Sequence, residues 1–254
     1  MNFLELLRER SAPFFWFGLL FFALAIVCLV ATRVSDQQVL GVNAYFKPFK
    51  FFVSSWLFAW TMGWYSGYLQ APTAVMIYTW FAIGVLCFQD FYILTQAARG
   101  LRSHFYVETP FYSGMFSLMA VTSVSLALAT LWVAALFFSD KVVQLPQYYV
   151  WSIRFGLLLF VLFALQGLLM GARGSHLVGA PDDAPGIRVL NWSRQVGDLR
   201  IAHFLGMHAL QLLPLMGWYV IRNVKGVAVF AVLYLVVCVF STLQALQGRP
   251  FLRL

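Results

Sequence analysis

One segment towards the C-terminal end of the chain combines an apolar run with several polar side chains. Residues 197–217 read GDLRIAHFLGMHALQLLPLMG. Their polar members are Asp198, Arg200, His203, His208 and Gln211. Histidine and aspartate can act as acids, bases or metal ligands, and arginine binds phosphates and carboxylates. The segment therefore predicts a binding or catalytic site on a hydrophobic helix.

A helical projection places these polar groups on one stripe. At roughly 100° per residue, His203 lies about 60° to one side of Arg200 and His208 about 80° to the other. The opposite arc holds only apolar or small residues. An ionisable side chain that faces hydrocarbon costs several kcal/mol, so the stripe is expected to face the interior of a bundle or a cavity.

Asp90 is the expected partner of this stripe. It is the only acidic residue within any predicted membrane span, and counting about 1.5 Å per residue gives it a depth similar to that of His208. A buried carboxylate needs a partner, and His208 is the first candidate. The predicted catalytic residues are Asp90, His203, His208 and Arg200.

Basic and amide residues near the same end of the predicted helices are expected to bind an anionic group such as a phosphate or a carboxylate. The predicted substrate-binding residues are Lys47, Lys50, Arg99, Arg102, Asn191, Asp198, Gln211 and Gln244. For Asp198 there is a structural alternative, because it is well placed to cap the helix that follows.

A metal site would need ligands from several elements. His203 and His208 are five residues apart, about 140° around a helix, and the chain has no HxxxH or HExxH motif. The predicted ligand set is Asp90, His104, His203 and His208, around a divalent metal such as zinc or iron, with haem b as the alternative. A histidine that only hydrogen-bonds a neighbouring helix is the structural alternative.

Composition places these residues in a membrane. The 254 residues are 62% hydrophobic and 10% charged, whereas soluble domains carry about 25% charged residues. Seven windows have the roughly 20 apolar residues that a spanning helix needs. They are 12–32, 51–70, 73–97, 113–138, 149–171, 201–220 and 226–246. We expect an all-α, seven-helix bundle that forms a single transmembrane domain over residues 1–254, with a long ordered loop at 172–199 that covers the site.

Charge and cysteine content agree with that class. The net charge of +8 has no basic run behind it, which favours contact with anionic lipid headgroups over nucleic acid. More Lys and Arg lie on the C-terminal side of seven spans, so the positive-inside rule predicts a cytoplasmic C-terminus. The cysteines Cys28, Cys87 and Cys238 have no CxxC spacing and are expected to pack in the core.

Four motifs carry a family resemblance: NAYFKPFKF, RGLRSHF, NWSRQVGDLRIAHFLGMHALQLLP and QALQGRP. They resemble those of an uncharacterised family of bacterial seven-helix membrane proteins, which implies a bacterial inner membrane and no particular activity. The arrangement is also loosely similar to the seven-helix zinc amide hydrolases of the alkaline ceramidase and adiponectin-receptor type. Those use a serine, an aspartate and three histidines, but their histidine pair is four residues apart.

Three function classes stay open from the sequence alone. The first is an enzyme that acts on a lipid-like or apolar substrate inside the membrane, with or without the assistance of a metal. The second is a redox protein that binds haem or quinone, although only His208 is deep enough for haem. The third is a transporter or a receptor-like protein that binds a small molecule, although no inverted repeat is visible.

Overall fold

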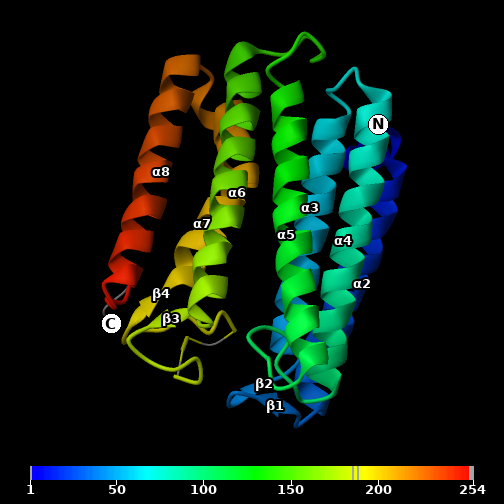
Figure 1. Ribbon diagram of the computed structural model, residues 1–254. Coiled ribbons are helices and arrows are strands. Elements are labelled where there is room, and N and C mark those ends of the chain that lie inside the picture. Colours follow the sequence, from blue (N-terminus) through cyan, green and yellow to red (C-terminus); the bar gives the residue numbers. More distant parts are fainter. Residues whose placement is uncertain (1, 185, 188, 252–254) are drawn as a thin grey trace. The chain divides into compact units, whose positions relative to one another are not determined.

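The computed structural model describes residues 2–184, 186–187 and 189–251. Pro185 and Arg188, in the predicted loop 172–199, lie outside the described residues. Most of the described chain is helical (Figure 1). Its helices are α1 (Phe3–Arg10), α2 (Ala12–Val34), α3 (Phe46–Ser66), α4 (Pro72–Ala98), α5 (Pro110–Leu136), α6 (Gln147–Arg173), α7 (Leu199–Met216), the π-helical turn η1 (Gly217–Ile221) and α8 (Val224–Leu246). Two short antiparallel ladders join β1 (Gln38–Val39) to β2 (Val42–Asn43) and β3 (Leu177–Val178) to β4 (Gly197–Asp198).

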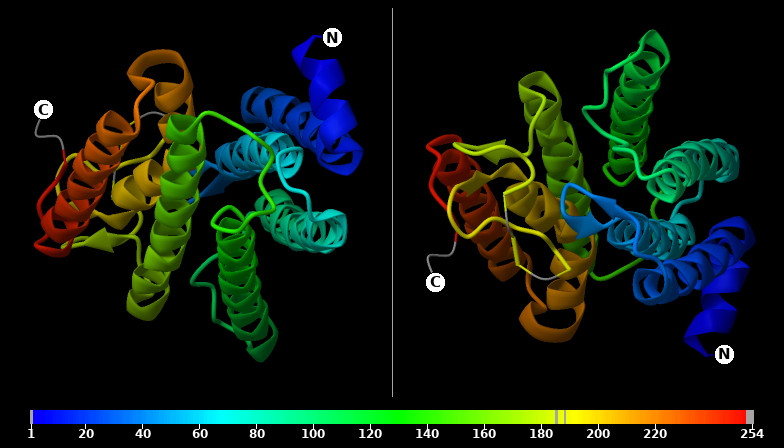
Figure 2. Two further views of the ribbon diagram at one scale, coloured as in Figure 1. Left: turned by 90° about the horizontal axis from the view of Figure 1, so that it is seen from above. Right: turned by 90° about the horizontal axis from the view of Figure 1, so that it is seen from below.

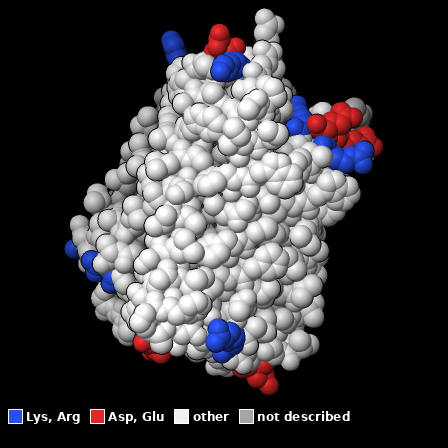
Figure 3. Space-filling view, turned by 45° about the vertical axis from the view of Figure 1, so that its right-hand side comes forward, with Lys and Arg blue, Asp and Glu red and all other residues white. Residues whose placement is uncertain are grey.

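Six of the described helices are long and apolar enough to cross a membrane. They are α2, α4, α5, α6, α7 with η1, and α8. Charged side chains on the face shown in Figure 3 gather towards the helix ends and leave a broad uncharged belt between them. This confirms an all-α polytopic membrane protein.

One of the seven predicted spans is not among those six helices. This span, 51–70, corresponds to α3. Two features lower the hydropathy of α3. The helix begins earlier than predicted, at Phe46, so Lys47 and Lys50 lie within it, and its sequence also contains tryptophans, a tyrosine and serines. Pro48 is tolerated because an N–H in the first turn of a helix has no backbone acceptor within that helix.

The chain forms two compact units. Unit 1 comprises Met1–Leu126 with Lys141–Val143, and unit 2 comprises Ala127–Asp140 with Gln144–Leu254. Helix α5 therefore begins in unit 1 and ends in unit 2. The structure defines each unit by itself, so the single transmembrane domain stays a prediction.

Unit 1 is packed with aromatic rings from α2, α3 and α4. Phe21 on α2 is completely buried, and its ring centroid lies 4.0 Å from that of Phe17, 5.1 Å from Phe52 and 6.0 Å from Phe91. Edge-on and tilted arrangements of this kind are favourable between aromatic rings. Interlocking side chains therefore hold these three helices together.

Unit 2 is packed through small residues. Figures 1 and 2 show α6, α7 and α8 side by side, and a buried cluster joins them, with Ala202 and Ala209 on α7 and Ala231 and Cys238 on α8. Between α6 and α7 the backbones come very close. A Cβ atom added at Gly156 would lie 2.9 Å from the Ala209 carbonyl oxygen. Such close approach is typical of membrane helices that pair through glycine and alanine.

Candidate functional site

The segment between α6 and α7 folds into a compact loop at one end of unit 2. Helix α6 ends at Gly174, whose φ of 63° is in the left-handed region that glycine adopts without strain. Residues 177–178 then pair with residues 197–198, and the Leu199 N–H donates to the His176 carbonyl at 3.1 Å. The two ends of the loop are thereby joined at the start of α7.

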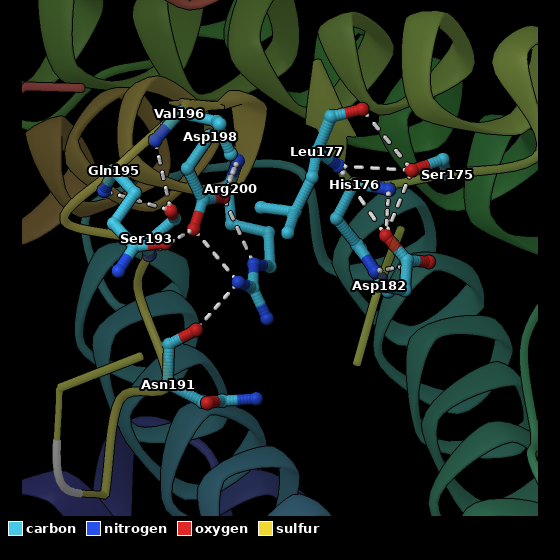
Figure 4. Close-up of polar contacts among 10 residues, drawn as sticks. All are labelled: Ser175, His176, Leu177, Asp182, Asn191, Ser193, Gln195, Val196, Asp198 and Arg200. Carbon is cyan, nitrogen blue, oxygen red and sulfur yellow. Dashed lines mark hydrogen bonds and ion pairs between the residues drawn. The ribbon is translucent and has the colours of Figure 1, made fainter. Parts of the chain in front are cut away.

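Asp182 ties the first half of this loop together (Figure 4). Its Oδ1 accepts from the Ser175 hydroxyl at 2.8 Å and from the backbone N–H of His176 at 3.0 Å, and its Oδ2 accepts from His176 Nδ1 at 3.1 Å. Partial burial opposes ionisation of the carboxyl. The hydrogen bonds and charge of His176, with the Ser175 bond, outweigh it and hold the pKa of Asp182 well below its usual range.

Asp198 ties the second half of the loop to α7. Its side chain is fully buried and accepts four hydrogen bonds. The Ser193 and Arg200 backbone N–H groups donate at 2.9 and 3.0 Å, and the Arg200 Nε and Nη2 atoms donate at 2.9 and 2.7 Å. The bond from the Arg200 backbone is that of a helix N-cap, so the capping role expected from the sequence is confirmed.

Arg200 is consequently held by one edge of its guanidinium. Nε and Nη2 contact Asp198, and Nη2 also donates to the Asn191 carbonyl. The other terminal nitrogen, Nη1, makes no bond within the described ranges, and Figure 4 shows it directed away from the bonded groups. The Arg200 side chain keeps 23% of its surface exposed. A positioned cation thus retains two N–H donors for an anion.

The two histidines of α7 lie in different surroundings. His203 Nδ1 donates to the Phe163 carbonyl of α6 at 2.6 Å, which is the interhelical bond of the structural alternative. His208 Nδ1 lies 3.3 Å from Gln211 Oε1 on the same helix. The His208 ring also packs against Phe204, with 4.3 Å between the ring centroids, and the Phe204 ring packs against Trp192 of the loop, with 5.3 Å between centroids. Trp192, Phe204 and His208 form a half-buried line of rings that we call the α7 aromatic track.

The predicted site residues of unit 1 fall into two places. Asp90 is buried in α4; the Ser55 hydroxyl hydrogen-bonds its carboxyl, and Oδ2 has no partner in the described chain. At the other place, Lys47 Nζ and the Ser103 hydroxyl each lie 3.1 Å from His104 Nδ1. Lys50 belongs to the first turns of α3 and Arg99 caps the C-terminus of α4. The Arg102 guanidinium lies 5.8 Å from the Tyr106 ring.

Unit membership decides which of these residues the structure brings together. Arg200, Asp198 and Asn191 are in contact within unit 2, as are His208 and Gln211. Gln244, also in unit 2, donates instead to the Pro250 carbonyl at 2.7 Å. Asp90 and His104 belong to unit 1, whereas His203 and His208 belong to unit 2. The pairing of Asp90 with His208 and the four-residue metal set therefore stay predictions.

Over residues 2–184, 186–187 and 189–251, no three His, Cys, Asp or Glu side chains are placed to hold a metal ion. His203 donates its Nδ1–H to the α6 carbonyl, a bond that leaves Nε2 able to bind a metal. The ligands of a divalent metal, or of haem b, stay a prediction.

Sequence reasoning missed Ser175, His176, Asp182 and Ser193. These residues organise the loop through bonds between side chains and backbone, and such bonds leave no periodic signal. The serine and aspartate content of GSHLVGAPDDAP was the only available indication, since both residues form local bonds of this kind.

No known family model, curated protein or solved structure matches the chain. The resemblance carried by the four motifs is therefore not supported by comparison, and no family is identified. The chain is a polytopic membrane protein with six candidate membrane helices.

Proposed function

We propose that this membrane protein binds a lipid-like anion along α7, at the loop end of unit 2. The observation that carries the proposal is Arg200, a rigidly held arginine with one terminal nitrogen unoccupied by any described residue. A planar guanidinium is suited to phosphate and carboxylate groups, and a fixed one loses little conformational freedom on binding.

The surroundings of Arg200 favour an amphipathic ligand over a small inorganic ion. Phe204 and His208 follow Arg200 at four-residue intervals, so they lie on the same side of α7. His208 is about 12 Å further along the helix axis at 1.5 Å per residue. An anionic head at Arg200 would leave the apolar body of the ligand on the α7 aromatic track.

Binding of 1-oleoyl lysophosphatidate, oleate and uncharged monoolein to the purified protein tests this function. We expect Arg200→Lys to weaken the binding of the two anions about tenfold, because lysine keeps the charge but lacks the planar guanidinium group. Monoolein binding should not change. Calorimetry or native mass spectrometry gives the affinities.

Arg194→Lys is the matched control, since Arg194 is an exposed arginine of the same loop. It should bind all three probes as the wild type does. Equal affinity of Arg200→Lys and Arg194→Lys for the anions, or equal wild-type affinity for oleate and monoolein, would contradict the proposal.

A hydrolytic reaction on the bound lipid is the second candidate, favoured by His208. With Nδ1 donating to Gln211, the Nε2 atom of His208 carries the lone pair of a general base and belongs to the same track. His208→Gln should abolish hydrolysis of a fluorogenic oleoyl ester while oleate still binds; unchanged turnover would rule this reaction out. Asp90 belongs to unit 1 and stays a separate prediction, for which loss of turnover in Asp90→Asn is the test.

We also propose that α3 crosses the membrane as a seventh span. Its 21 residues extend about 32 Å at 1.5 Å per residue, enough for a hydrocarbon layer of about 30 Å. It packs between α2 and α4, both candidate spans, and an enclosed helix needs less hydropathy than one that faces lipid.

Labelling of single cysteines in bacterial inner-membrane vesicles tests both this topology and the proposed cytoplasmic C-terminus. Gln38→Cys precedes α3 and Gln70→Cys follows it, and both positions are exposed. An impermeant maleimide should reach residue 38 from the cytoplasmic side and residue 70 from the other. Labelling of both from one side would exclude α3 as a span.

A further inference from the structure

A groove of about 380 Å³ lies at the end of unit 1 where α2 and α4 begin and α3 ends. Its polar lining includes Glu9, Arg10, Ser11 and Thr79, and its apolar lining includes Met76 and Trp80. The size is within the range of ligand sites in proteins. None of these residues belongs to the loop of unit 2 or to the predicted catalytic set.

Thr79 is the most unusual residue of the groove. Four other threonines in helices, Thr61, Thr95, Thr122 and Thr242, donate to the carbonyl four residues earlier at 2.6 to 3.0 Å. Thr79 is 3% exposed, yet its hydroxyl has no partner in the part of the chain that the structure describes. A buried hydroxyl without a hydrogen bond is costly, so this one points to a bound group.

Ser11 supplies a second hydroxyl to the same groove. It is 8% exposed and connects α1 to α2 as the N-cap position of α2, but its side chain makes no capping bond. Serine at this position normally bonds the helix backbone. Two nearly buried residues with hydroxyl groups, one at the junction of α1 and α2 and one on α4, therefore line the same groove, and neither hydroxyl makes the helix-backbone bond that is usual at its position.

The charged residues of the groove are of opposite sign and adjacent in sequence. Arg10 lies across the rings of Trp64 and Tyr68, 3.9 and 4.3 Å from their centroids, and Nη1 donates to the Trp64 carbonyl at 3.1 Å. These contacts hold the guanidinium in place, and Arg10 is one of the residues that line the groove. Glu9 is exposed on the last turn of α1.

The apolar side of the groove continues along α4. Met76 and Trp80 are four residues apart and are 57% and 59% exposed. They lie on a candidate membrane span, next to the helix end that carries the charged residues. Charged residues at the helix end and apolar side chains along α4 match the polarity of a phospholipid at the membrane interface, with the Thr79 hydroxyl between Met76 and Trp80 in the sequence.

We propose that this groove binds one phospholipid with an amine-bearing headgroup. The lipid phosphate is bound by Arg10 with the hydroxyls of Ser11 and Thr79, the ammonium group by Glu9, and one acyl chain lies against Met76 and Trp80. The opposite charges select a zwitterionic headgroup, because phosphatidylglycerol offers the same phosphate to Arg10 but has no ammonium group to pair with Glu9.

Native mass spectrometry of the full-length protein, titrated with dioleoyl phosphatidylethanolamine or dioleoyl phosphatidylglycerol, tests the proposal. The wild type should retain one equivalent of phosphatidylethanolamine in preference to phosphatidylglycerol. Thr79→Val keeps the shape of the side chain and should weaken phosphatidylethanolamine binding about three- to tenfold, because the valine cannot donate. Glu9→Gln should remove the preference between the two lipids.

Thr73→Val is the matched control, since Thr73 is exposed on the same helix outside the groove. It should bind phosphatidylethanolamine as the wild type does. Ser11→Ala is a second test if Thr79→Val does not fold, because Ser11 makes no capping bond that its loss would break. Equal binding by the groove variants and Thr73→Val, or stronger binding of phosphatidylglycerol than of phosphatidylethanolamine by the wild type, overturns the proposal.

Discussion

Aromatic rings are more prominent in the helix contacts described for unit 1, and glycines in those described for unit 2. In unit 1, α2, α3 and α4 are joined by large aromatic rings such as those of Phe21, Phe52 and Phe91. In unit 2, α6 and α7 meet at Gly156, Gly206 and Gly217, and the nearest neighbours are backbone atoms and side chains of the facing helix.

The difference follows from the absence of water inside a membrane. Hydrocarbon is as apolar as leucine, so helices associate there through van der Waals contact and interhelical hydrogen bonds. In both units a ring N–H reaches a carbonyl of the facing helix, from Trp60 to Phe15 in unit 1 and from His203 to Phe163 in unit 2. Aromatic rings make contact between helices whose backbones are far apart, whereas glycine allows the backbones of two helices to come into contact. Unit 1 is therefore expected to suffer most from lost volume, and unit 2 from added volume.

Phe21→Ala should have the largest effect, a loss of about 3 kcal/mol in the stability of unit 1. The substitution leaves a cavity among Phe17, Phe52 and Phe91. Thermal or denaturant unfolding in detergent measures the loss, with Phe81→Ala, on an exposed position of α4, as the control. A similar loss for both variants would mean that the ring cluster does not hold unit 1 together.

Gly206→Leu should destabilise unit 2 by about 2 kcal/mol, the usual range for overpacking. Even a Cβ atom at residue 206 would overlap the Phe163 ring, so α6 and α7 must separate. Gly171→Leu on α6 adds the same side chain where nothing lies within 4 Å, and its unfolding should match that of the wild type. If both leucines were tolerated equally, close contact between α6 and α7 would be disproved.

His203→Leu should cost about 1 kcal/mol, because interhelical hydrogen bonds in membranes contribute about 0.6 to 1.7 kcal/mol. The variant loses the donor to the Phe163 carbonyl. His203→Asn retains an N–H donor and should recover part of the loss in the same unfolding assay. No difference between leucine and asparagine would show that the bond contributes little to the pairing of α6 and α7.

The smallest effect is expected in the loop that precedes α7. Asp182→Asn should leave global unfolding unchanged but accelerate hydrogen exchange at the His176 and Leu177 amides, both of which donate to Asp182. Asp183→Asn, at an exposed neighbouring position, is the control and should not change exchange at either amide. Equal exchange in all three proteins would contradict this role of Asp182.

The carboxyl of Asp182 also makes the stability of the loop depend on pH. Its pKa in the folded protein is lower than the value of about 3.9 in an unfolded chain, so its stabilisation is complete above about pH 4. It is lost as the pH falls through the lower, folded-state pKa. Protection of the His176 amide, corrected for intrinsic exchange, should hold from pH 7 to about pH 4 and then decrease. Asp182→Asn should show no such decrease.

The sequence predicted the helices better than it predicted the contacts between them. Apolar runs of about 20 residues give long helices regardless of their neighbours, and the capping role of Asp198 is read from local sequence alone. Hydropathy alone does not assign α3 as a span, because an enclosed helix can carry Lys47, Lys50 and three tryptophans without facing lipid. Local patterns do not contain the bonds of Asp182, which join residues through closure of the whole loop. The unsatisfied hydroxyl of Thr79 was also invisible, since most threonines in helices bond their own backbone.

The π-helical turn at residues 217–221 has a consequence for how this chain tolerates changes in length. The Arg222 N–H bonds the Gly217 carbonyl five residues earlier, one residue more than in an α-helix, so the turn holds one additional residue. Removal of a residue at the start of the turn should restore α-helical bonding and rotate the side chains that follow in the turn by about 100°. Trp218, whose ring lies 4.9 Å from that of Tyr149, would lose its position against α6. A helix should therefore still form after a single-residue deletion in this turn, and the main effect should be a change in the side chains that pack against α6.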